Sequence, residues 1–152
     1  MKKFTFTLQT VHQIRERRRD GAERELAASG IELEKAKAHL VEVLEMRQQA
    51  VNRYVALHQT SQIEASTVAM HTNYIGSLME LERLARNSIA KNERLVAIKR
   101  EKLIEASREE ETTANLRDRQ FERHVLETAR KEQILLDEMA VMAVARQRSS
   151  NQ

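Results

Sequence analysis

Residues 22–57 read AERELAASGIELEKAKAHLVEVLEMRQQAVNRYVAL, and small or apolar side chains recur in this segment at alternating steps of four and three residues. The series occupies positions 22, 26, 29, 33, 36, 40, 43, 47, 50, 54 and 57, and only Ser29 and Arg47 interrupt it. A stripe with this spacing stays on one helix face only if helices supercoil around each other with a left-handed twist. The segment therefore predicts one arm of a coiled coil.

The same spacing returns in the second half of the chain. The positions that carry it are 74, 78, 81, 85, 89, 92, 96, 99, 103 and 106, with two consecutive steps of four from 81 to 89, and most of them are apolar. Between the two series, residues 58–73 are rich in Ser, Thr, Gln and His, and Ser61 and Glu64 have the spacing of a helix capping box. Two helical segments joined by one turn most economically form an antiparallel pair.

The sequence thus predicts an all-α protein, built as a long antiparallel two-helix coiled-coil hairpin. We expect a single antiparallel coiled-coil domain over residues 1–146. Its parts are arm one at about 4–57, a turn at about 58–73 and arm two at about 74–146, followed by a disordered tail at 147–152.

The composition agrees with a helical chain that has no membrane span and no disulfides. Ala, Glu, Lys, Leu and Arg make up 79 of the 152 residues, a share typical of coiled coils. The chain has no Cys, Pro or Trp, so it has neither a disulfide framework nor a thiolate site. No apolar run approaches the ~20 residues that a membrane-spanning helix needs. We therefore expect a cytoplasmic protein without direct membrane insertion.

Nothing in the sequence indicates catalysis, a cofactor or a metal. The five histidines lack the spacing of a helical zinc site. The three glycines, at 21, 30 and 76, are too scattered to form a phosphate-binding loop. Glu109, Glu110 and Glu111 are consecutive carboxylates, but acid–base catalysis needs a pocket that separates their pKa values. The sequence therefore predicts that the protein is not an enzyme and has no cofactor.

The arginine cluster Arg15, Arg17, Arg18 and Arg19 is the sharpest charge feature. Residues 1–20 have a net charge of +4, whereas the remaining residues sum to −1. If the turn centres near residue 65, facing positions have numbers that sum to about 130. The cluster would then lie opposite Glu109–Glu111, and Phe4 opposite the region of Leu126. The arginines either are neutralised across the hairpin or form a docking patch for an acidic protein; without a recognised nucleic-acid motif, nucleic acid comes third.

Two further features suggest binding surfaces. Tyr54, Tyr74 and Leu78 gather near the turn, where the scarce aromatics either close the seam or contact a partner. Residues past about 130 have no partner in the predicted hairpin and include the apolar run from Met139 to Ala145. An isolated helix is marginal in water, so an unpaired apolar end favours contact with a partner.

Several motifs resemble the FliJ family, soluble components of the bacterial flagellar type III export apparatus. The opening Phe4-Thr5-Phe6-Thr7-Leu8 resembles the family's F-x-F-x-L start. As in the family, an arginine-rich segment follows it, and then the segment Ala22-Glu23-Arg24-Glu25-Leu26-Ala27. Tyr74 stands four residues before Leu78, where family members carry an aromatic before a Leu. The segment Leu136-Asp137-Glu138-Met139-Ala140 resembles the family's Asp-Glu-containing helix end, so the resemblance spans nearly all of 1–146.

The resemblance implies a stalk similar to that of rotary ATP synthases. Such a stalk would insert into the export ATPase hexamer, touch the cytoplasmic domain of the export gate protein and escort export chaperones. It would lie in the cytoplasm, peripheral to the inner membrane beneath the flagellar basal body. The family's gate-contacting residues match here at Tyr54, Tyr74 and Leu78, and more loosely at Leu81. The neighbouring Arg47, Ala50 and Ala85 depart from the family pattern.

We expect the end of the hairpin that carries both termini to dock into the ATPase ring, because basic and apolar side chains meet there. The expected docking residues are Phe4, Leu8, Arg15, Arg17, Arg18, Arg19, Met139 and Met142. The alternatives are a generic cytoplasmic coiled-coil adaptor, in which the F-x-F-x-L match is accidental, and a basic protein that associates with nucleic acid.

Overall fold

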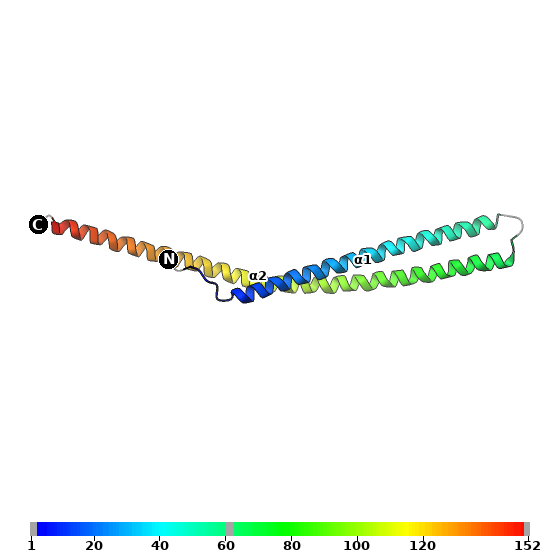
Figure 1. The fold of residues 1–152 in the computed structure, drawn as a ribbon, viewed down its shortest axis with the longest axis horizontal. Helices are drawn as coiled ribbons and strands as arrows, with labels where there is room; N and C mark the ends of the chain where they lie inside the picture. Colours follow the sequence, from blue (N-terminus) through cyan, green and yellow to red (C-terminus); the bar gives the residue numbers. More distant parts are fainter. Residues whose placement is uncertain (1–2, 60–62, 151–152) are drawn as a thin grey trace. The chain divides into compact units, whose positions relative to one another are not determined.

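The computed structural model describes residues 3–59 and 63–150 of the chain. Over these residues it consists of two long helices, α1 (Gln9–Leu57) and α2 (Ala65–Ser150), and contains no strand (Figure 1). The helices pack against each other as a hairpin, so the predicted all-α fold is confirmed. Contacts such as those of Arg47 with Glu82 and of Glu25 with Lys102 make the pair antiparallel, with facing numbers close to the expected sum.

The first helix begins later than predicted. Residues 3–8 are not helical, and the Gln9 amide donates a 3.2 Å hydrogen bond to the Phe6 carbonyl, which forms a turn before α1. Thr5, Thr7 and the two phenylalanines are poor helix formers, and the Phe6 side chain is buried. The prediction that arm one is helical from about Phe4 is therefore wrong by roughly one turn of helix.

The second helix is longer at both ends than predicted. It begins at Ala65, where the Glu64 carbonyl accepts hydrogen bonds from the amides of Thr67 and Val68. Residues 65–73, predicted as turn, are therefore helical, and so are residues 147–150 of the predicted tail. No Gly or Pro interrupts either extension, and an established helix adds each residue at little cost. Residues 60–62 of the predicted turn and 151–152 of the tail lie outside the described residues.

The contacts group the chain into two compact units, and each contains parts of both helices. Unit 1 comprises Met1–Arg19 and Ala106–Gln152, and unit 2 comprises Asp20–Glu105. The single domain over 1–146 stays a prediction.

The seam of α1 in unit 2 is confirmed. All eleven positions of the predicted series from Ala22 to Leu57 are buried or half-buried. Val43 is fully enclosed, which stabilises the pair by about 1.5–3 kcal/mol relative to an exposed side chain. Ala22 and Ala50 are also buried, and their small side chains allow the helices to approach closely.

The seam of α2 differs from the prediction at two positions. Tyr74 and Leu81, both predicted in the seam, are 47% and 42% exposed. The next residues along the chain, Ile75 and Glu82, lie on the buried side instead. A prediction based on apolar residues places Leu81 in the seam and not Glu82. However, Arg47 of α1 brings a positive charge into the seam and pairs with Glu82. From Ala85 to Ala106 the predicted and observed series agree.

In unit 1, the N-terminal segment packs on α2. The Phe4 ring meets Phe121 edge-on at a centroid distance of 5.3 Å and lies 5.6 Å from the ring of His124. The expected neighbour, Leu126, is instead 71% exposed, because the irregular backbone before Gln9 does not keep the helical register. Beyond Thr128, every side chain that the structure describes, up to residue 146, is exposed.

Candidate functional site

The apolar side chains nearest the helix connection divide into an inward and an outward set. Leu78 is only 2% exposed and belongs to the core of unit 2. Tyr74 and Leu81 are exposed on α2. Tyr54 lies at the edge of the seam, half-buried, and its ring contacts that of His58 in a tilted arrangement with centroids 4.3 Å apart. Of the four residues expected to contact the gate, Tyr74 and Leu81 are therefore available to a partner, Tyr54 is partly so, and Leu78 is not.

The structure adds two residues to the outward set. Met70 and Leu84 are also exposed. Together with Tyr74 and Leu81 they form a second helical series, in which each residue immediately precedes a residue of the buried series. We call Met70, Tyr74, Leu81 and Leu84 the tip stripe. The sequence carries this second series, at positions 70, 74, 77, 81 and 84, and its spacing equals that of the seam.

Beside the tip stripe lies an ionic cluster. One oxygen of the Glu82 carboxylate accepts a hydrogen bond from Nη1 of Arg47. The other oxygen accepts from Nε and Nη2 of Arg86, at 3.0 and 2.7 Å. Only 12% of the Glu82 side chain is exposed. A carboxylate so far removed from water is tolerated because both of its oxygens are paired.

In unit 1, the arginine cluster is partly neutralised across the hairpin. Arg15 donates a 2.9 Å hydrogen bond from Nη1 to the Glu109 carbonyl, and Arg18 forms a 3.8 Å ion pair with the Glu109 carboxylate. Arg19 is half-buried. Arg17 is exposed, and no other described residue forms a hydrogen bond or ion pair with it. The Glu109 carboxylate therefore neutralises Arg18, whereas Arg15 is held by the Glu109 carbonyl and Arg17 is left for a partner.

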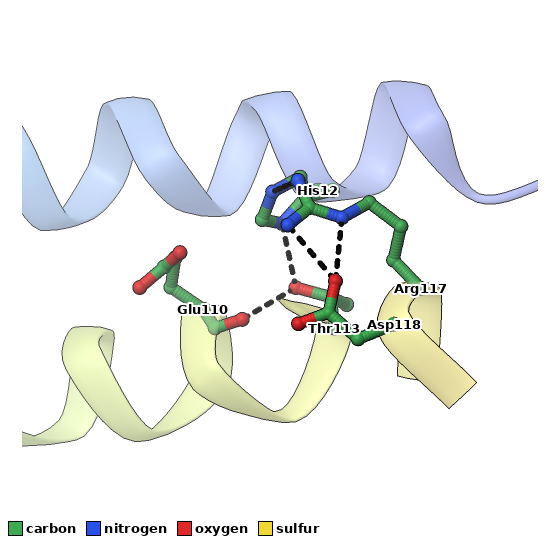
Figure 2. A network of polar contacts seen from close by, with 5 residues as sticks. All are labelled: His12, Glu110, Thr113, Arg117 and Asp118. Atoms are coloured by element: carbon green, nitrogen blue, oxygen red, sulfur yellow. Dashed lines mark hydrogen bonds and ion pairs between the residues drawn. The ribbon is translucent and has the colours of Figure 1, made fainter. Parts of the chain in front are cut away.

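A buried histidine joins the helices beside this cluster. His12 is 4% exposed, and Figure 2 shows it projecting from α1 toward Thr113 and Arg117 of α2. Arg117 only donates hydrogen bonds, so its 3.4 Å contact requires Nε2 of His12 to be the acceptor. The proton of His12 is then on Nδ1 and is donated to the Thr113 hydroxyl at 3.2 Å. That hydroxyl donates to the Glu110 carbonyl at 2.8 Å.

The remaining residues expected to dock into the ATPase ring are distributed over unit 1. Phe4 is packed on α2, and Leu8 is exposed in the turn before α1. Met139 and Met142 are exposed in a stretch of α2 that is apolar on almost all faces. Its other exposed apolar residues are Ile134, Leu135, Leu136, Val141 and Val144. A helix that is apolar around its circumference is normally buried in a partner.

No group of three or more His, Cys, Asp or Glu within 3–59 and 63–150 has a metal-binding arrangement. In the same part of the chain, neither helix contains a segment long and apolar enough to cross a membrane.

The chain matches a family model described as the flagellar FliJ protein over residues 4–149. Among solved structures, a YscO homologue from Chlamydia trachomatis is similar, with a TM-score of 0.69 and 18% sequence identity. The alignment covers 99% of this chain and 100% of that one. At this identity the likeness supports the fold alone. A comparison with curated protein sequences finds no match.

Proposed function

Because the chain belongs to the FliJ family of flagellar export proteins, we propose that it is a coiled-coil stalk that links the export ATPase ring to the export gate. It acts without chemistry of its own and escorts export chaperones. Its place is the cytoplasm, peripheral to the inner membrane beneath the flagellar basal body. The family match favours this role over a generic coiled-coil adaptor or a nucleic-acid-associated protein.

The observation that carries the proposal is that each unit has an exposed group of apolar side chains. The tip stripe belongs to unit 2, and the apolar stretch of α2 from Ile134 to Val144 belongs to unit 1. Soluble proteins rarely leave contiguous apolar surface uncovered unless it binds something. Two such surfaces on one chain suit a protein with two different partners.

The tip stripe is the proposed contact for the cytoplasmic domain of the gate protein. It offers an exposed aromatic, Tyr74, flanked by Leu81, and interface hot spots are enriched in tyrosine. Tyr54 lies across the seam and can add the exposed part of its ring. Leu78 supports the stripe from the core and does not contact the gate.

The second surface is the proposed contact for the ATPase hexamer. A ring can surround a helix, so it can cover a segment that is apolar on almost every side. Met139 and Met142 suit a contact that must slip or repack, because methionine is unbranched and adaptable. Arg17 would steer association with an acidic ring opening, an effect that acts on the association rate and weakens with salt.

A binding assay with two double variants tests the proposal. We expect Tyr74→Ala with Leu81→Ala to weaken gate binding at least about tenfold, the scale of a hot-spot loss, and to leave ATPase binding unchanged. We expect Met139→Ser with Met142→Ser to give the opposite result. Met79→Ala is the matched control, because Met79 is an exposed methionine of α2 outside the tip stripe.

Circular dichroism establishes that each variant is still helical before binding is compared. The stalk proposal is wrong if both double variants bind both partners as tightly as the unmodified chain. It is also wrong if each variant weakens the two interactions equally.

A further inference from the structure

Over residues 70–89, α2 carries more apolar side chains than one seam can bury. The buried series holds His71, Ile75, Leu78, Glu82, Ala85 and Ile89. The series predicted from the sequence shares Leu78, Ala85 and Ile89 with it but replaces Ile75 with Tyr74 and Glu82 with Leu81. Hydrophobic burial therefore favours the predicted series, because it would exchange a glutamate for a leucine. The fold nevertheless buries Glu82 and leaves Leu81 outside.

The two arrangements differ by a local rotation of α2 over residues 74–82, because both bury the same positions from Ala85 onward. Successive residues are about 100° apart around a helix, so a turn of about half that angle moves Tyr74 and Leu81 into the seam and Ile75 and Glu82 out of it. The helix path need not change. The tip stripe would lose its two central side chains to the core.

Arg47 supplies the reason for the observed rotation. It occupies a seam position of α1, half-buried, and its guanidinium bonds the Glu82 carboxylate. If α2 turned to bury Leu81, Glu82 would move toward solvent and Arg47 would face a leucine. Arg47 would then lose its charge-assisted hydrogen bond, and water would replace it only in part, because 38% of the side chain is exposed. Arg86, one turn along α2, bonds the second Glu82 oxygen and holds the carboxylate toward the seam.

We propose that Arg47 and Glu82 are positioning residues that fix the rotation of α2 and so keep Tyr74 and Leu81 on the outside of the hairpin. The pair selects which of two apolar series is available for binding. This inference rests on the proposed function in one respect only, which is that the partner of the tip stripe is the gate protein.

Hydroxyl-radical footprinting of the full-length chain, with oxidation of single residues read by mass spectrometry, tests the proposal directly. In the unmodified chain we expect Tyr74 and Leu81 to be oxidised faster than Ile75, as their exposure requires. In Arg47→Leu we expect the Leu81 rate to fall about tenfold, as its exposed fraction drops from 42% toward the 2% of Leu78. The Ile75 rate should rise in the same variant.

Two further variants separate positioning from a general structural effect. Arg47→Lys keeps the positive charge at the seam, so it should retain the unmodified oxidation pattern. Arg83→Leu removes an arginine that is paired with Glu80 on the exposed side of the same helix, and it should also leave the pattern unchanged. An Arg47→Leu chain that stays helical and still oxidises Leu81 at the unmodified rate would overturn the proposal.

If Arg47→Leu loses helicity, Glu82→Gln provides the same test with a side chain of nearly identical size. Loss of the negative charge weakens the hydrogen bond between residue 82 and Arg47, which holds this side of α2 in the seam. We therefore expect the oxidation rate of Leu81 to fall by about twofold or more. An unchanged rate contradicts the proposal here as well.

Gate binding by the same variants distinguishes this inference from the proposed function. A shifted footprint with weakened gate binding supports both. A shifted footprint with unchanged gate binding supports the positioning role and rejects the tip stripe as the gate contact.

Discussion

Phe4 and Phe121 lie edge to face with their ring centroids 5.3 Å apart, although 116 residues separate them in the sequence. Phe4 precedes the first helix, so this contact ties an irregular segment to α2 within unit 1. The N-terminal segment Phe4-Thr5-Phe6-Thr7-Leu8 therefore has a structural role, with Phe4 against Phe121 and Phe6 buried.

Phe4→Ala should lower the stability of unit 1 by about 1–2 kcal/mol, below the range for a fully buried phenylalanine because Phe4 is half-buried. Amide hydrogen exchange over residues 10–19 measures this loss locally. Leu126→Ala is the control, since Leu126 is largely exposed and its loss should change exchange by less than about 0.5 kcal/mol. Equal effects of the two variants would mean that the ring contact contributes nothing.

Thr113→Val should destabilise unit 1 by about 1–3 kcal/mol, because a buried N–H of His12 loses its acceptor while the side-chain shape is kept. Urea unfolding followed by circular dichroism gives the difference. The neighbouring Thr112→Val is a matched control: Thr112 is exposed, and its hydroxyl bonds only the Arg108 carbonyl of its own helix. The His12 network has no structural importance if the two valine variants are equally stable.

Glu25 should make the stability of unit 2 depend on acid pH. Hydrogen bonds from Lys99 and Lys102, at 2.9 and 3.0 Å, lower the pKa of its carboxyl from 4.5 to about 2. Because the folded-state pKa is the lower one, the stabilisation is fully present above pH 4.5 and is lost as the pH falls through about 2.

Glu25→Gln removes this titration. The difference in unfolding free energy between the unmodified chain and Glu25→Gln should therefore shrink steadily as the pH is lowered from 5 toward 2. Glu23→Gln, at an exposed glutamate without a described ion pair, should show no such trend. A pH-independent difference for Glu25→Gln would contradict the role of the two lysines.

Arg17→Ala and Arg15→Ala should have different consequences. Arg17 is exposed without a described partner, so its removal should slow association with the ATPase several-fold at low salt and leave stability within about 0.5 kcal/mol. Arg15 bonds the Glu109 carbonyl, so its removal should lower stability by about 1 kcal/mol. Stopped-flow binding at two salt concentrations and thermal unfolding separate the effects, and an unchanged association rate for Arg17→Ala would exclude steering.

Much of the hairpin is predictable from the residues alone. The seam of α1 from Ala22 to Leu57 matches the prediction at every position, because apolar side chains at coiled-coil spacing have only one face to bury. Even Arg47, which interrupts the apolar series, occupies the predicted seam position, since a single charged residue does not change the period of the helix. The exposure of residues 129–146 also follows from the unequal lengths of the two arms.

The ends of the helices and the candidate site were less predictable. Residues 65–73 contain Ser, Thr and Asn, which favour turns, but no residue that forbids a helix, and α2 starts at Ala65. Leu78 was expected at the gate contact because of its position near Tyr74. Both the predicted and the observed series bury Leu78, so its burial follows from the spacing. The exposure of Tyr74 and Leu81 is what depends on which face of α2 meets α1.

The sequence by itself determined that the chain forms two long helices, that they pair, and which face of α1 is buried, because helical period and apolar spacing are local properties. Only the tertiary structure decided which side of α2 faces inward over residues 74–82. Two apolar series with the same spacing compete there, and the charge of Arg47, 35 residues away from Glu82 in the chain, makes the burial of that glutamate the better solution. Tyr74 and Leu81 are consequently on the surface.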